Sequence, residues 1–488
     1  MHTDEAVQAV KFGKLLEEGF YEYDPFEYHG PSLNYITLIP AWISGTSTFK
    51  DLNKRILRSV PVFFGLFLVL LAFFINKRLE ILVAGIAVLL IGISPAMVFY
   101  SRYYIHELIL VTFTYLSILS YTQALEKRSI GWLLLLGVSV GFMIITKETW
   151  VISFGMIGLS FVVLFRKHLK AYLLKPWKWL IVLSVAFAVV GLFFTSFFSH
   201  PNGLMDMVST YSTYLERAGT NEIHKNPWYY YLQLLIYKSG DNKIWSEAVI
   251  LIFTIMGYYF LFRNLKRNKE WNILRFIGVF SLLLLLVYSA LPYKTPWNLL
   301  SFYYGFILIA AFGIVHSLMS LKRNFPKFVL LLLLVVAGGH LLIQNFYEYE
   351  EPASPYNPWV YGHTSSDFEE VIQKIDSAAI NDDTYIEVIF SGNDYWPFPW
   401  YLRKYNQVAY RSQVDFDSPN GEIILISPQV EEQLVEKLYE RPKPGERHLY
   451  MNLFDDVQEL RPGVYFYGYM QQELWIKNQN KLNDPESL

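Results

Sequence analysis

Residues 59–99 read SVPVFFGLFLVLLAFFINKRLEILVAGIAVLLIGISPAMVF, two long apolar runs separated by Lys77, Arg78 and Leu79. A helix needs about 20 apolar residues to cross the hydrocarbon core of a bilayer, because it rises only about 1.5 Å per residue. Each of the two runs is close to that length. The sequence therefore predicts two membrane spans that are joined by a short basic loop.

The same pattern recurs along most of the chain. We expect ten spans, at residues 59–76, 80–99, 105–122, 130–146, 148–165, 178–199, 244–263, 273–292, 297–318 and 326–345. The segment from Pro31 to Gly45 is apolar but short, and Pro40 interrupts it, so we expect it to be interfacial or re-entrant. Only 17% of the residues are charged, whereas soluble domains have about 25%. The expected fold class is therefore an α-helical polytopic membrane protein.

Alternate connections between these spans are rich in Lys and Arg. The opposite short loops carry only Arg102, Lys147 and Lys294. Basic loops stay in the cytoplasm, so we expect the N-terminus and everything after the tenth span to lie outside it. The predicted location is the cytoplasmic (plasma) membrane, with the functional face extracytoplasmic.

The composition changes after Gln344, where soluble patterns begin. The helix candidates are Asp367–Ala379, with Ser366 as its expected N-cap, and Val430–Tyr439, and the strand candidates are Thr384–Phe390 and Glu422–Ser427. We therefore expect three parts: an external loop with interfacial segments (1–58), a transmembrane domain (59–345) and an extracytoplasmic soluble α/β domain (346–488).

Composition also excludes several classes of function. The chain has no cysteine, which excludes disulfides, thiolate metal sites and cysteine nucleophiles. Its net charge of −2 gives no broad basic surface for nucleic acid. No Asp, Glu, Lys or Arg lies near the centre of a predicted span, which is unlike an ion-coupled transporter. The charges instead cluster at the outer ends of the spans, at the level of lipid headgroups.

Acidic residues near two outer ends are candidate catalytic groups. Sugar transfer needs a base that deprotonates the acceptor hydroxyl, and a carboxylate also stabilises oxocarbenium charge. Asp4 and Glu5 near the N-terminus fit that role, the alternative being a mobile acidic tail. Glu107 opens a predicted span and either orients the acceptor or binds a metal. Its alternative is a carboxylate favoured there by the helix dipole.

Cations and a histidine on the same side are candidate binding groups. Lys147 and Lys294 are isolated outer lysines that would contact a donor phosphate as point charges. The alternative for Lys147 is an interfacial lysine paired with Glu148. His29 would contact phosphate or sugar, the alternative being a loop with a tight turn at Gly30-Pro31.

Several short strings, taken in order, resemble the C-type glycosyltransferases of the protein O-mannosyltransferase and aminoarabinose-transferase superfamily. The narrower resemblance is to the subfamily named for its association with flippase activity. The strings are His2-Thr3-Asp4-Glu5-Ala6, Tyr23-Asp24-Pro25, Tyr28-His29-Gly30-Pro31, Ser101-Arg102, Thr146-Lys147-Glu148, Asn226-Pro227-Trp228-Tyr229-Tyr230-Tyr231, Lys294-Thr295-Pro296-Trp297 and Tyr395-Trp396-Pro397-Phe398-Pro399-Trp400-Tyr401-Leu402-Arg403.

This resemblance implies an inverting sugar transfer from a polyprenyl-phosphate donor to an unknown glycan, lipid or protein acceptor of the cell envelope. Asp4, with Glu5 beside it, matches the external-loop acid proposed as general base, and Glu107 matches the second external acid. For the donor phosphate or sugar we choose the side chains of His29, Arg102, Lys147 and Lys294. The resemblance leaves a divalent metal open, with Asp4 and Glu107 as its ligands.

The sequence departs from the superfamily pattern in one respect, and two functions other than glycosyl transfer are possible alternatives. Members of the superfamily have a span directly before the acidic motif, whereas here the motif begins at the second residue. We therefore expect either a late start codon or a truncated gene, and a parent chain with eleven spans and a cytoplasmic N-terminus. The first rival function is a lipid-linked-sugar flippase or transporter, against which the uncharged span centres stand. The second is a non-catalytic assembly subunit.

Overall fold

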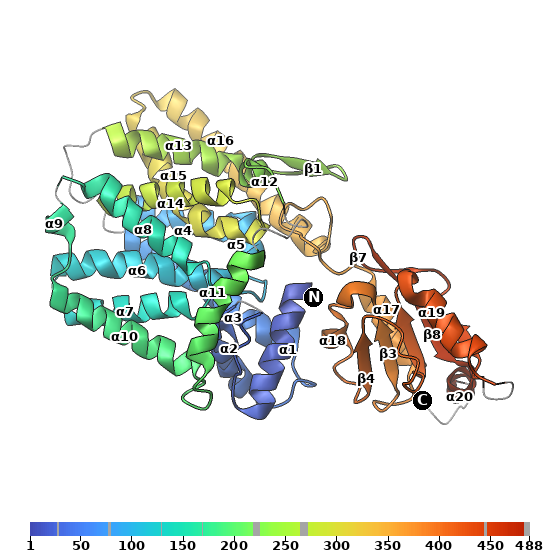
Figure 1. The fold of residues 1–488 in the computed structure, drawn as a ribbon. Coiled ribbons are helices and arrows are strands. Elements are labelled where there is room, and N and C mark those ends of the chain that lie inside the picture. The colour runs from blue at the N-terminus through green and yellow to red at the C-terminus, as the bar shows by residue number, and fades with distance from the viewer. Residues whose placement is uncertain are drawn as a thin grey trace.

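A bundle of helices and a small sheet domain beside one of its ends make up the chain (Figure 1). The computed structural model describes residues 1–26, 29–76, 80–127, 129–167, 169–217, 225–263, 272–443 and 447–482. Tyr28 and the predicted basic connections at 77–79, 128 and 264–271 lie outside the described residues.

Ten apolar helices build the bundle in the part of the chain that the structure describes. Six are long and apolar enough to cross a membrane: α3 (Lys54–Asn76), α6 (Glu107–Lys127), α10 (Pro176–Phe194), α14 (Asn272–Ala290), α15 (Leu300–Ser320) and α16 (Asn324–Glu350). Four are shorter: α4 (Ile81–Ile93), α7 (Ile130–Ile144), α8 (Trp150–Phe165) and α13 (Ala248–Arg263). Each overlaps one predicted span, so the helical polytopic fold is confirmed.

The predicted span at residues 80–99 is two helices in the structure, not one. α4 ends at Ile93, and α5 (Pro95–Tyr100) begins at a proline, which cannot continue the hydrogen-bond ladder of the preceding helix. The buried carboxylate of Glu247 accepts hydrogen bonds from Ser94 Oγ at 2.6 Å and from the backbone nitrogen of Ala96 at 2.8 Å. Glu247 thereby satisfies orphan donors at the start of α5.

Close packing of the helices depends on small residues. A Cβ on Gly313 of α15 would lie 2.1 Å from the carbonyl oxygen of Phe253, and one on Gly257 of α13 would lie 2.3 Å from that of Ile309. Glycine lets the two backbones approach, as is usual where membrane helices pack. α15 is consequently buried over most of its length at the centre of the bundle.

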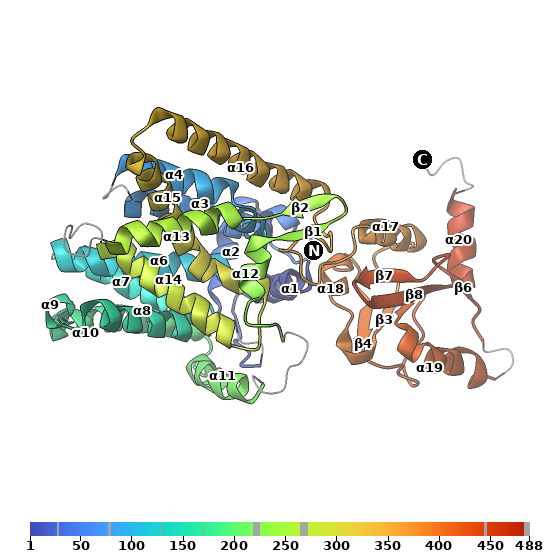
Figure 2. The same ribbon diagram turned by 90° about the horizontal axis from the view of Figure 1, so that it is seen from above.

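Short elements join the bundle to its surroundings. They are α1 (Thr3–Glu18), α2 (Ser32–Ile43), α9 (Leu169–Tyr172), α11 (Gly203–Arg217), α12 (Tyr230–Ile236), β1 (Lys238–Gly240), β2 (Lys243–Trp245) and the 3₁₀ turn η2 (Pro296–Leu299). α1, α12 and the β1–β2 hairpin lie towards the C-terminal domain, and α9 lies at the far end (Figures 1 and 2). Segments predicted to share one side of the membrane thus share one end of the bundle, while its orientation in the cell stays a prediction.

The C-terminal domain is an α/β sheet domain, in agreement with the sequence patterns (Figure 2). Its sheet has the order β4-β3-β5-β8-β6, with β7 also paired to β8. The strands are β3 (Ile386–Ile389), β4 (Val408–Arg411), β5 (Ile423–Ile426), β6 (Tyr450–Asn452), β7 (Gln458–Arg461) and β8 (Val464–Gln471). The helices are α17 (Phe368–Ala378), α18 (Phe398–Tyr401), α19 (Glu431–Val435) and α20 (Gln472–Leu482), with short turns at Ser391–Asn393, Pro428–Val430 and Glu436–Glu440.

The central strands of this domain are buried at every position. β3 pairs in parallel with β4 and β5, and every residue of β3 and β5 is buried, as expected where both faces of a parallel sheet are covered. The predicted helix and strand segments are therefore confirmed, apart from one cap. Asp367 precedes α17 as its N-cap, so the prediction of Ser366 was wrong by one residue.

Polar contacts fix this domain against the start of the chain. Lys54 pairs with Glu369, and Lys50 pairs with Asp382. Both pairs are exposed, so each contributes little stability. Arg403 adds a 2.7 Å hydrogen bond from Nη2 to the Leu52 carbonyl. These contacts join the sheet domain to residues 50–54, where the chain enters α3.

Candidate active site

The acidic motif lies at a capped helix start. His2 precedes α1, and its Nδ1 accepts a 3.0 Å hydrogen bond from the backbone nitrogen of Asp4. In return, Glu5 Oε2 accepts a 3.1 Å bond from the backbone nitrogen of His2. Such reciprocal capping satisfies two orphan donors of the helix. The segment is thus an ordered helix, and the alternative of a mobile tail was wrong.

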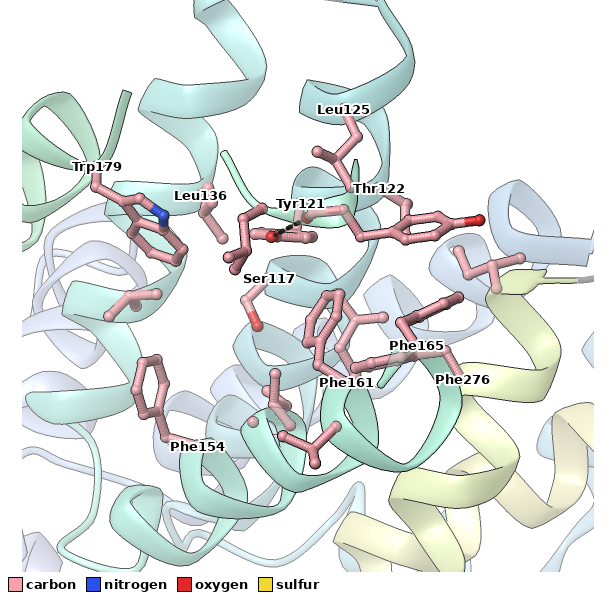
Figure 3. Close-up of a pocket in the computed structure, with 18 of the residues that line it drawn as sticks. Ser117, Tyr121, Thr122, Leu125, Leu136, Phe154, Phe161, Phe165, Trp179 and Phe276 are labelled. Carbon is pink, nitrogen blue, oxygen red and sulfur yellow. Dashed lines mark hydrogen bonds between the residues drawn. The ribbon is translucent and has the colours of Figure 1, made fainter. Parts of the chain in front are cut away.

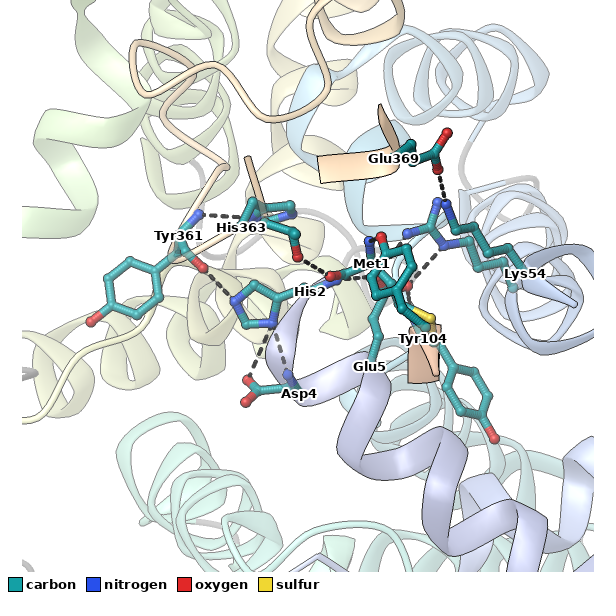
Figure 4. A network of polar contacts seen from close by, with 12 residues as sticks. Met1, His2, Asp4, Glu5, Lys54, Tyr104, Tyr361, His363 and Glu369 are labelled. Carbon is teal, nitrogen blue, oxygen red and sulfur yellow. Dashed lines mark hydrogen bonds and ion pairs between the residues drawn. The ribbon is translucent and has the colours of Figure 1, made fainter. Parts of the chain in front are cut away.

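Glu5 faces the bundle and is fully buried. Arg58 of α3 donates two hydrogen bonds to the Glu5 carboxylate, from Nε to Oε1 at 2.8 Å and from Nη2 to Oε2 at 2.7 Å. The backbone nitrogen of Tyr104 donates a third, at 3.0 Å. Burial opposes ionisation, but the Arg58 guanidinium outweighs it and lowers the pKa of Glu5 to about 2. Both oxygens are occupied, so Glu5 anchors α1 to α3 (Figure 4).

Because of the ion pair between Glu5 and Arg58, we expect the protein to lose stability in acid. Because the folded-state pKa of Glu5 is about 2 and its ordinary value is 4.5, its contribution is present above about pH 4.5 and is lost as the pH falls towards 2. That contribution is about 3 kcal/mol. We expect unfolding curves at stepped pH to show the wild type losing stability in this window more steeply than Glu5→Gln. Equal slopes for the two proteins would contradict the ion pair.

Asp4 points the other way, with 48% of its side chain exposed. Its Oδ2 lies 3.9 Å from His2 Nδ1, and the close-up in Figure 4 shows the two side by side. Aromatic rings surround this corner: the His2 ring centroid lies 5.2 Å from that of Tyr103 and 6.0 Å from that of Trp297. His363, from the C-terminal part, stacks on Tyr103 at 5.5 Å. Asp4 is therefore the accessible carboxylate of the motif.

Tyr103 is a buried tyrosine beside His2 of the acidic motif. Burial raises the pKa of the Tyr103 hydroxyl, and the carboxylates of Asp4, Glu5 and Glu107 raise it further, so all three act on this one group. The hydroxyl is buried and has no hydrogen-bond partner among the described residues. Sequence reasoning did not single out Tyr103, His363 or Arg58.

Glu107 and Lys147 form a buried ion pair at the same end. Burial opposes the charge of Lys147, but Glu107 and Glu148 outweigh it and raise its pKa above the ordinary value. Glu148 pairs instead with His29, whose Nδ1 lies 3.2 Å from Glu148 Oε2. The pairing of Lys147 with Glu148 that the sequence left open is therefore replaced by one with Glu107.

A short backbone pairing brings His29 to this place. His29 bridges Lys147 in antiparallel fashion, and the Gly30 nitrogen donates to the Thr146 carbonyl at 3.1 Å. His106 Nε2 lies 3.0 Å from the Gly30 carbonyl oxygen. A Cβ on Gly30 would lie 2.1 Å from the Ile145 carbonyl oxygen, so only glycine fits here.

We therefore expect Gly30→Ala to destabilise the protein by about 3 kcal/mol, the upper end for overpacking, because a backbone carbonyl cannot move aside as a side chain does. Thermal unfolding in detergent measures this effect. Gly85→Ala in α4 is the matched control, because nothing lies within 4 Å of the added carbon. A Gly30→Ala protein as stable as the Gly85→Ala protein would contradict the close approach.

The remaining two cations have different partners. Arg102, half-exposed, bonds Glu348 of α16 at 3.2 Å. Lys294 is buried and donates to the backbone carbonyls of Asn226, at 2.9 Å, and Leu291. No carboxylate pairs with Lys294 in the described chain, and burial lowers its pKa. Lys294 thus differs from the other three predicted binding residues, because it is a buried cation that only backbone carbonyl groups contact in the described chain.

Contacts tie the Lys294 loop to the rest of the site. Trp297, three residues further on, touches His2, and its ring centroid lies 5.7 Å from that of Tyr361. Tyr293 acts electrostatically on Lys147. The structure therefore gathers Asp4, His29, Glu107, Lys147 and the Lys294 loop at one end of the bundle.

The predicted metal ligands do not fit a metal site by themselves. Glu107 is bound to Lys147, and Asp4 lies beside His2. Over the described ranges, no three His, Asp or Glu side chains come close enough together to hold a metal ion. We therefore derive no step through a metal.

An apolar cavity of about 940 Å³ opens between α6, α7, α8, α10 and α14. α8 lines it with Phe154, Phe161 and Phe165, and Figure 3 shows these rings facing Tyr121 and Trp179. α8 starts three residues after Lys147. Tyr172 of α9 and Trp179 near the start of α10 also line the cavity, so it lies in the half of the bundle towards α9.

Comparison with known proteins yields a family match for one segment and a similar fold for most of the chain. Residues 36–202 match the family described as dolichyl-phosphate-mannose-protein mannosyltransferase. No curated protein matches the chain. Among solved structures, ArnT from Cupriavidus metallidurans bound to undecaprenyl phosphate is similar with a TM-score of 0.61 and 12% identity, over 95% of this chain and 93% of that one.

A second solved structure is similar as well. It is the archaeal oligosaccharyltransferase AglB from Archaeoglobus fulgidus in complex with an inhibitory peptide and a dolichol-phosphate, with a TM-score of 0.54 and 12% identity, over 88% of this chain and 66% of that one. Residues 36–202 therefore match that family, and the chain as a whole has a fold similar to those of ArnT and AglB. The narrower flippase-associated resemblance stays a prediction.

Proposed function

We propose that the chain transfers a sugar from a polyprenyl-phosphate donor to an acceptor hydroxyl, with inversion, and that Asp4 is the general base. The observation that carries this proposal is the contrast between two adjacent carboxylates. Both oxygens of Glu5 accept hydrogen bonds from Arg58, whereas the side chain of Asp4 is half-exposed. Asp4 stands at the end of the bundle where the predicted cations gather. The family match over residues 36–202 supports glycosyl transfer as the reaction class.

We infer the donor end of the site from the cation Lys294 and from the apolar cavity deeper in the bundle. An ammonium group carries three donors, and Lys294 uses two of them on backbone carbonyls. We assign its third donor and its charge to the lipid phosphate, and we assign Lys147 with Glu107 to positioning. His29 and Arg102 are assigned to the edge of the donor sugar. The apolar cavity along α8 has the character and volume needed for part of a polyprenyl chain.

Each group then has one task in a single displacement. Asp4 accepts the proton of the acceptor hydroxyl, and the acceptor oxygen attacks the anomeric carbon from the side opposite the phosphate. The bond from the anomeric carbon to the phosphate oxygen breaks, and the lipid phosphate leaves as an anion. Lys294 stabilises the charge that develops on the leaving phosphate.

Transfer in proteoliposomes tests the proposal. We expect labelled sugar to move from a polyprenyl-phosphate donor to a covalent product when the protein and a crude envelope fraction are present. Labelled lipid that crosses the bilayer without any covalent transfer would instead establish the flippase alternative. If neither sugar transfer nor lipid crossing is detected, the remaining function is the non-catalytic assembly subunit.

We also propose that the three parts 1–58, 59–345 and 346–488 assemble the site on the extracytoplasmic side of the plasma membrane. The chain has no cysteine, so one introduced cysteine reports its own location. We expect Glu432→Cys, on the C-terminal domain, to react with a membrane-impermeant maleimide in intact cells or spheroplasts. Reaction only after lysis would reverse the proposed orientation.

A further inference from the structure

A polar cleft of about 630 Å³ runs along the face of α1 that the bundle does not bury. Its other walls are the turn at residues 20–25, Asp206 of α11 and Trp396 of the C-terminal domain. Its volume lies within the ~300–1,000 Å³ that is common for ligand sites. The cleft is separate from the apolar cavity along α8, because the two share no lining residue.

Asp4 lies on the same face of α1 as the residues that line the cleft. Asp4, Val7, Lys11, Lys14 and Glu18 follow one another at spacings of three or four residues, so they share one face of α1. The opposite face, which includes Glu5 and Phe12, is buried. All members of the exposed face except Asp4 line the cleft, and Asp4 stands one helical turn before Val7. From Asp4 to Glu18 the helix axis extends about 21 Å, at about 1.5 Å per residue.

The lining is charged but not anion-binding. Two ammonium groups face four carboxylates: Lys11 and Lys14, against Glu18, Glu22, Asp24 and Asp206. Burial lowers the pKa of Lys11 to about 8, with Asp24 partly opposing this shift, so Lys11 is still mostly charged at neutral pH and the four carboxylates outnumber the two ammonium groups. A phosphorylated or polyanionic acceptor would be repelled here. An uncharged molecule rich in hydroxyl groups finds both hydrogen-bond donors and acceptors along the whole cleft.

Aromatic rings contribute to the lining. Tyr23 is buried: its hydroxyl and Thr210 Oγ1 are 2.8 Å apart, and its ring packs edge-on against Phe194. Trp396 is partly exposed, and its backbone carbonyl accepts a 2.5 Å bond from Arg461, which also pairs with Asp394. The Trp396 ring is suited to stacking on the apolar face of a sugar ring, because an amphipathic ring combines a flat surface with a polar edge.

The lining is less suited to a peptide. A peptide is bound mostly along a strand edge or, as a helix, in an apolar groove. The described lining residues come from two helices, a turn and a loop, so they offer no strand edge. Charged side chains along α1 also make the cleft unlike an apolar groove.

We propose that this cleft binds the acceptor, and that the acceptor is an extended, uncharged oligosaccharide whose end hydroxyl reaches Asp4. This inference rests on the proposed function of Asp4. The C-terminal domain, through Trp396, then closes the cleft over the sugar chain and takes part directly in acceptor selection.

Photo-crosslinking tests the assignment with the full chain in nanodiscs. The probes are neutral tetrasaccharides of glucose, mannose and N-acetylglucosamine with a diazirine at the reducing end. A serine-containing tetrapeptide and a phosphorylated tetrasaccharide carry the same group for comparison. We expect at least one neutral probe to label residues 7–25 or Trp396. Labelling of the cleft by the peptide or the anionic probe, with none by the neutral probes, would overturn the proposal, and so would labelling nowhere in the cleft.

Variants make the test quantitative. We expect Trp396→Ala to weaken binding of the labelling tetrasaccharide about tenfold, and Lys14→Ala to weaken it in the same direction. Tyr465→Ala is the matched control, because this ring is exposed on the same domain but does not line the cleft. Lys14 is exposed, so its variant keeps the test decisive if Trp396→Ala unfolds. Unchanged binding in a folded Lys14→Ala protein and in a folded Trp396→Ala protein would refute the cleft assignment.

Release of labelled sugar to water from the polyprenyl-phosphate donor, without acceptor, separates the two proposals. Donor turnover without tetrasaccharide binding would refute the acceptor cleft and leave the proposed function intact. Tetrasaccharide binding without any donor turnover would show that the cleft binds sugar, and it would refute both the transferase and the cleft's role as an acceptor site.

Discussion

Asp4→Asn is expected to lower kcat for sugar transfer by about 10²–10⁴-fold, the usual contribution of a positioned general base. Asparagine keeps the shape of the side chain but cannot accept the acceptor proton at neutral pH. Because the Asp4 carboxylate is half-exposed and only approaches His2, we expect little change in stability. Initial rates with a polyprenyl-phosphate donor in proteoliposomes give kcat and KM separately.

The matched control for this prediction is Glu370→Gln. Glu370 is an exposed carboxylate on α17, at the same end of the molecule. We expect it to transfer sugar at the wild-type rate. A folded Asp4→Asn protein that keeps more than half of the wild-type kcat would remove Asp4 from the base role. A raised KM with unchanged kcat would reduce its role to acceptor binding.

Arg58→Ala is expected to lower the free energy of unfolding by about 3–5 kcal/mol, because it leaves the carboxylate of Glu5 buried without its partner. Glu5 is fully buried and accepts two bonds from Arg58, so no water replaces the guanidinium without a rearrangement of α1. Chemical denaturation in detergent, followed by tryptophan fluorescence, measures the change. Activity should fall as well, because α1 carries Asp4.

Two further proteins isolate the ion pair. Arg55→Ala removes an exposed arginine three residues earlier in the same helix, and we expect a change within about 0.5 kcal/mol. The double variant Glu5→Gln/Arg58→Met removes both charges, and it should recover much of the lost stability. Equal effects of Arg55→Ala and Arg58→Ala would show that Glu5 does not depend on Arg58.

The helices of the bundle were predictable because the thickness of a bilayer fixes the length of an apolar run. The strand β5 was predictable for a similar reason, since four consecutive apolar residues are typical of a parallel sheet. In β3 three of the four residues are apolar, and the fourth is the buried Glu387. Ser94-Pro95 split one predicted span into α4 and α5, a boundary that the proline itself indicates.

The site was predictable only in part, because side-chain partners depend on tertiary packing. Lys147 and Glu148 are adjacent in sequence, yet each finds its partner on another segment, Glu107 and His29 respectively. The division of roles between Asp4 and Glu5 follows from which face of α1 is buried. The spacing of Ala6, Ala9 and Phe12 indicates that face in the sequence, but only once the segment is taken as a helix.

The position of Arg58 in the sequence is itself unusual and could have indicated its role. Arg58 stands with Lys54 and Arg55 at the outer end of the first span, where the distribution of positive charge predicts few cations. The structure pairs Lys54 with Glu369 and Arg58 with Glu5. His363 left no such signal, because the loop that carries it approaches Asp4 only through the docking of the C-terminal domain.

A structure of the full chain in nanodiscs with a non-hydrolysable polyprenyl-phosphonate sugar tests the central claim most directly. The account predicts the phosphonate within hydrogen-bond distance, about 3 Å, of Lys294 Nζ, with the lipid chain along α8 and the anomeric carbon open towards Asp4. A phosphonate bound at the far end of the bundle beside α9, or an anomeric carbon turned away from Asp4, would contradict it.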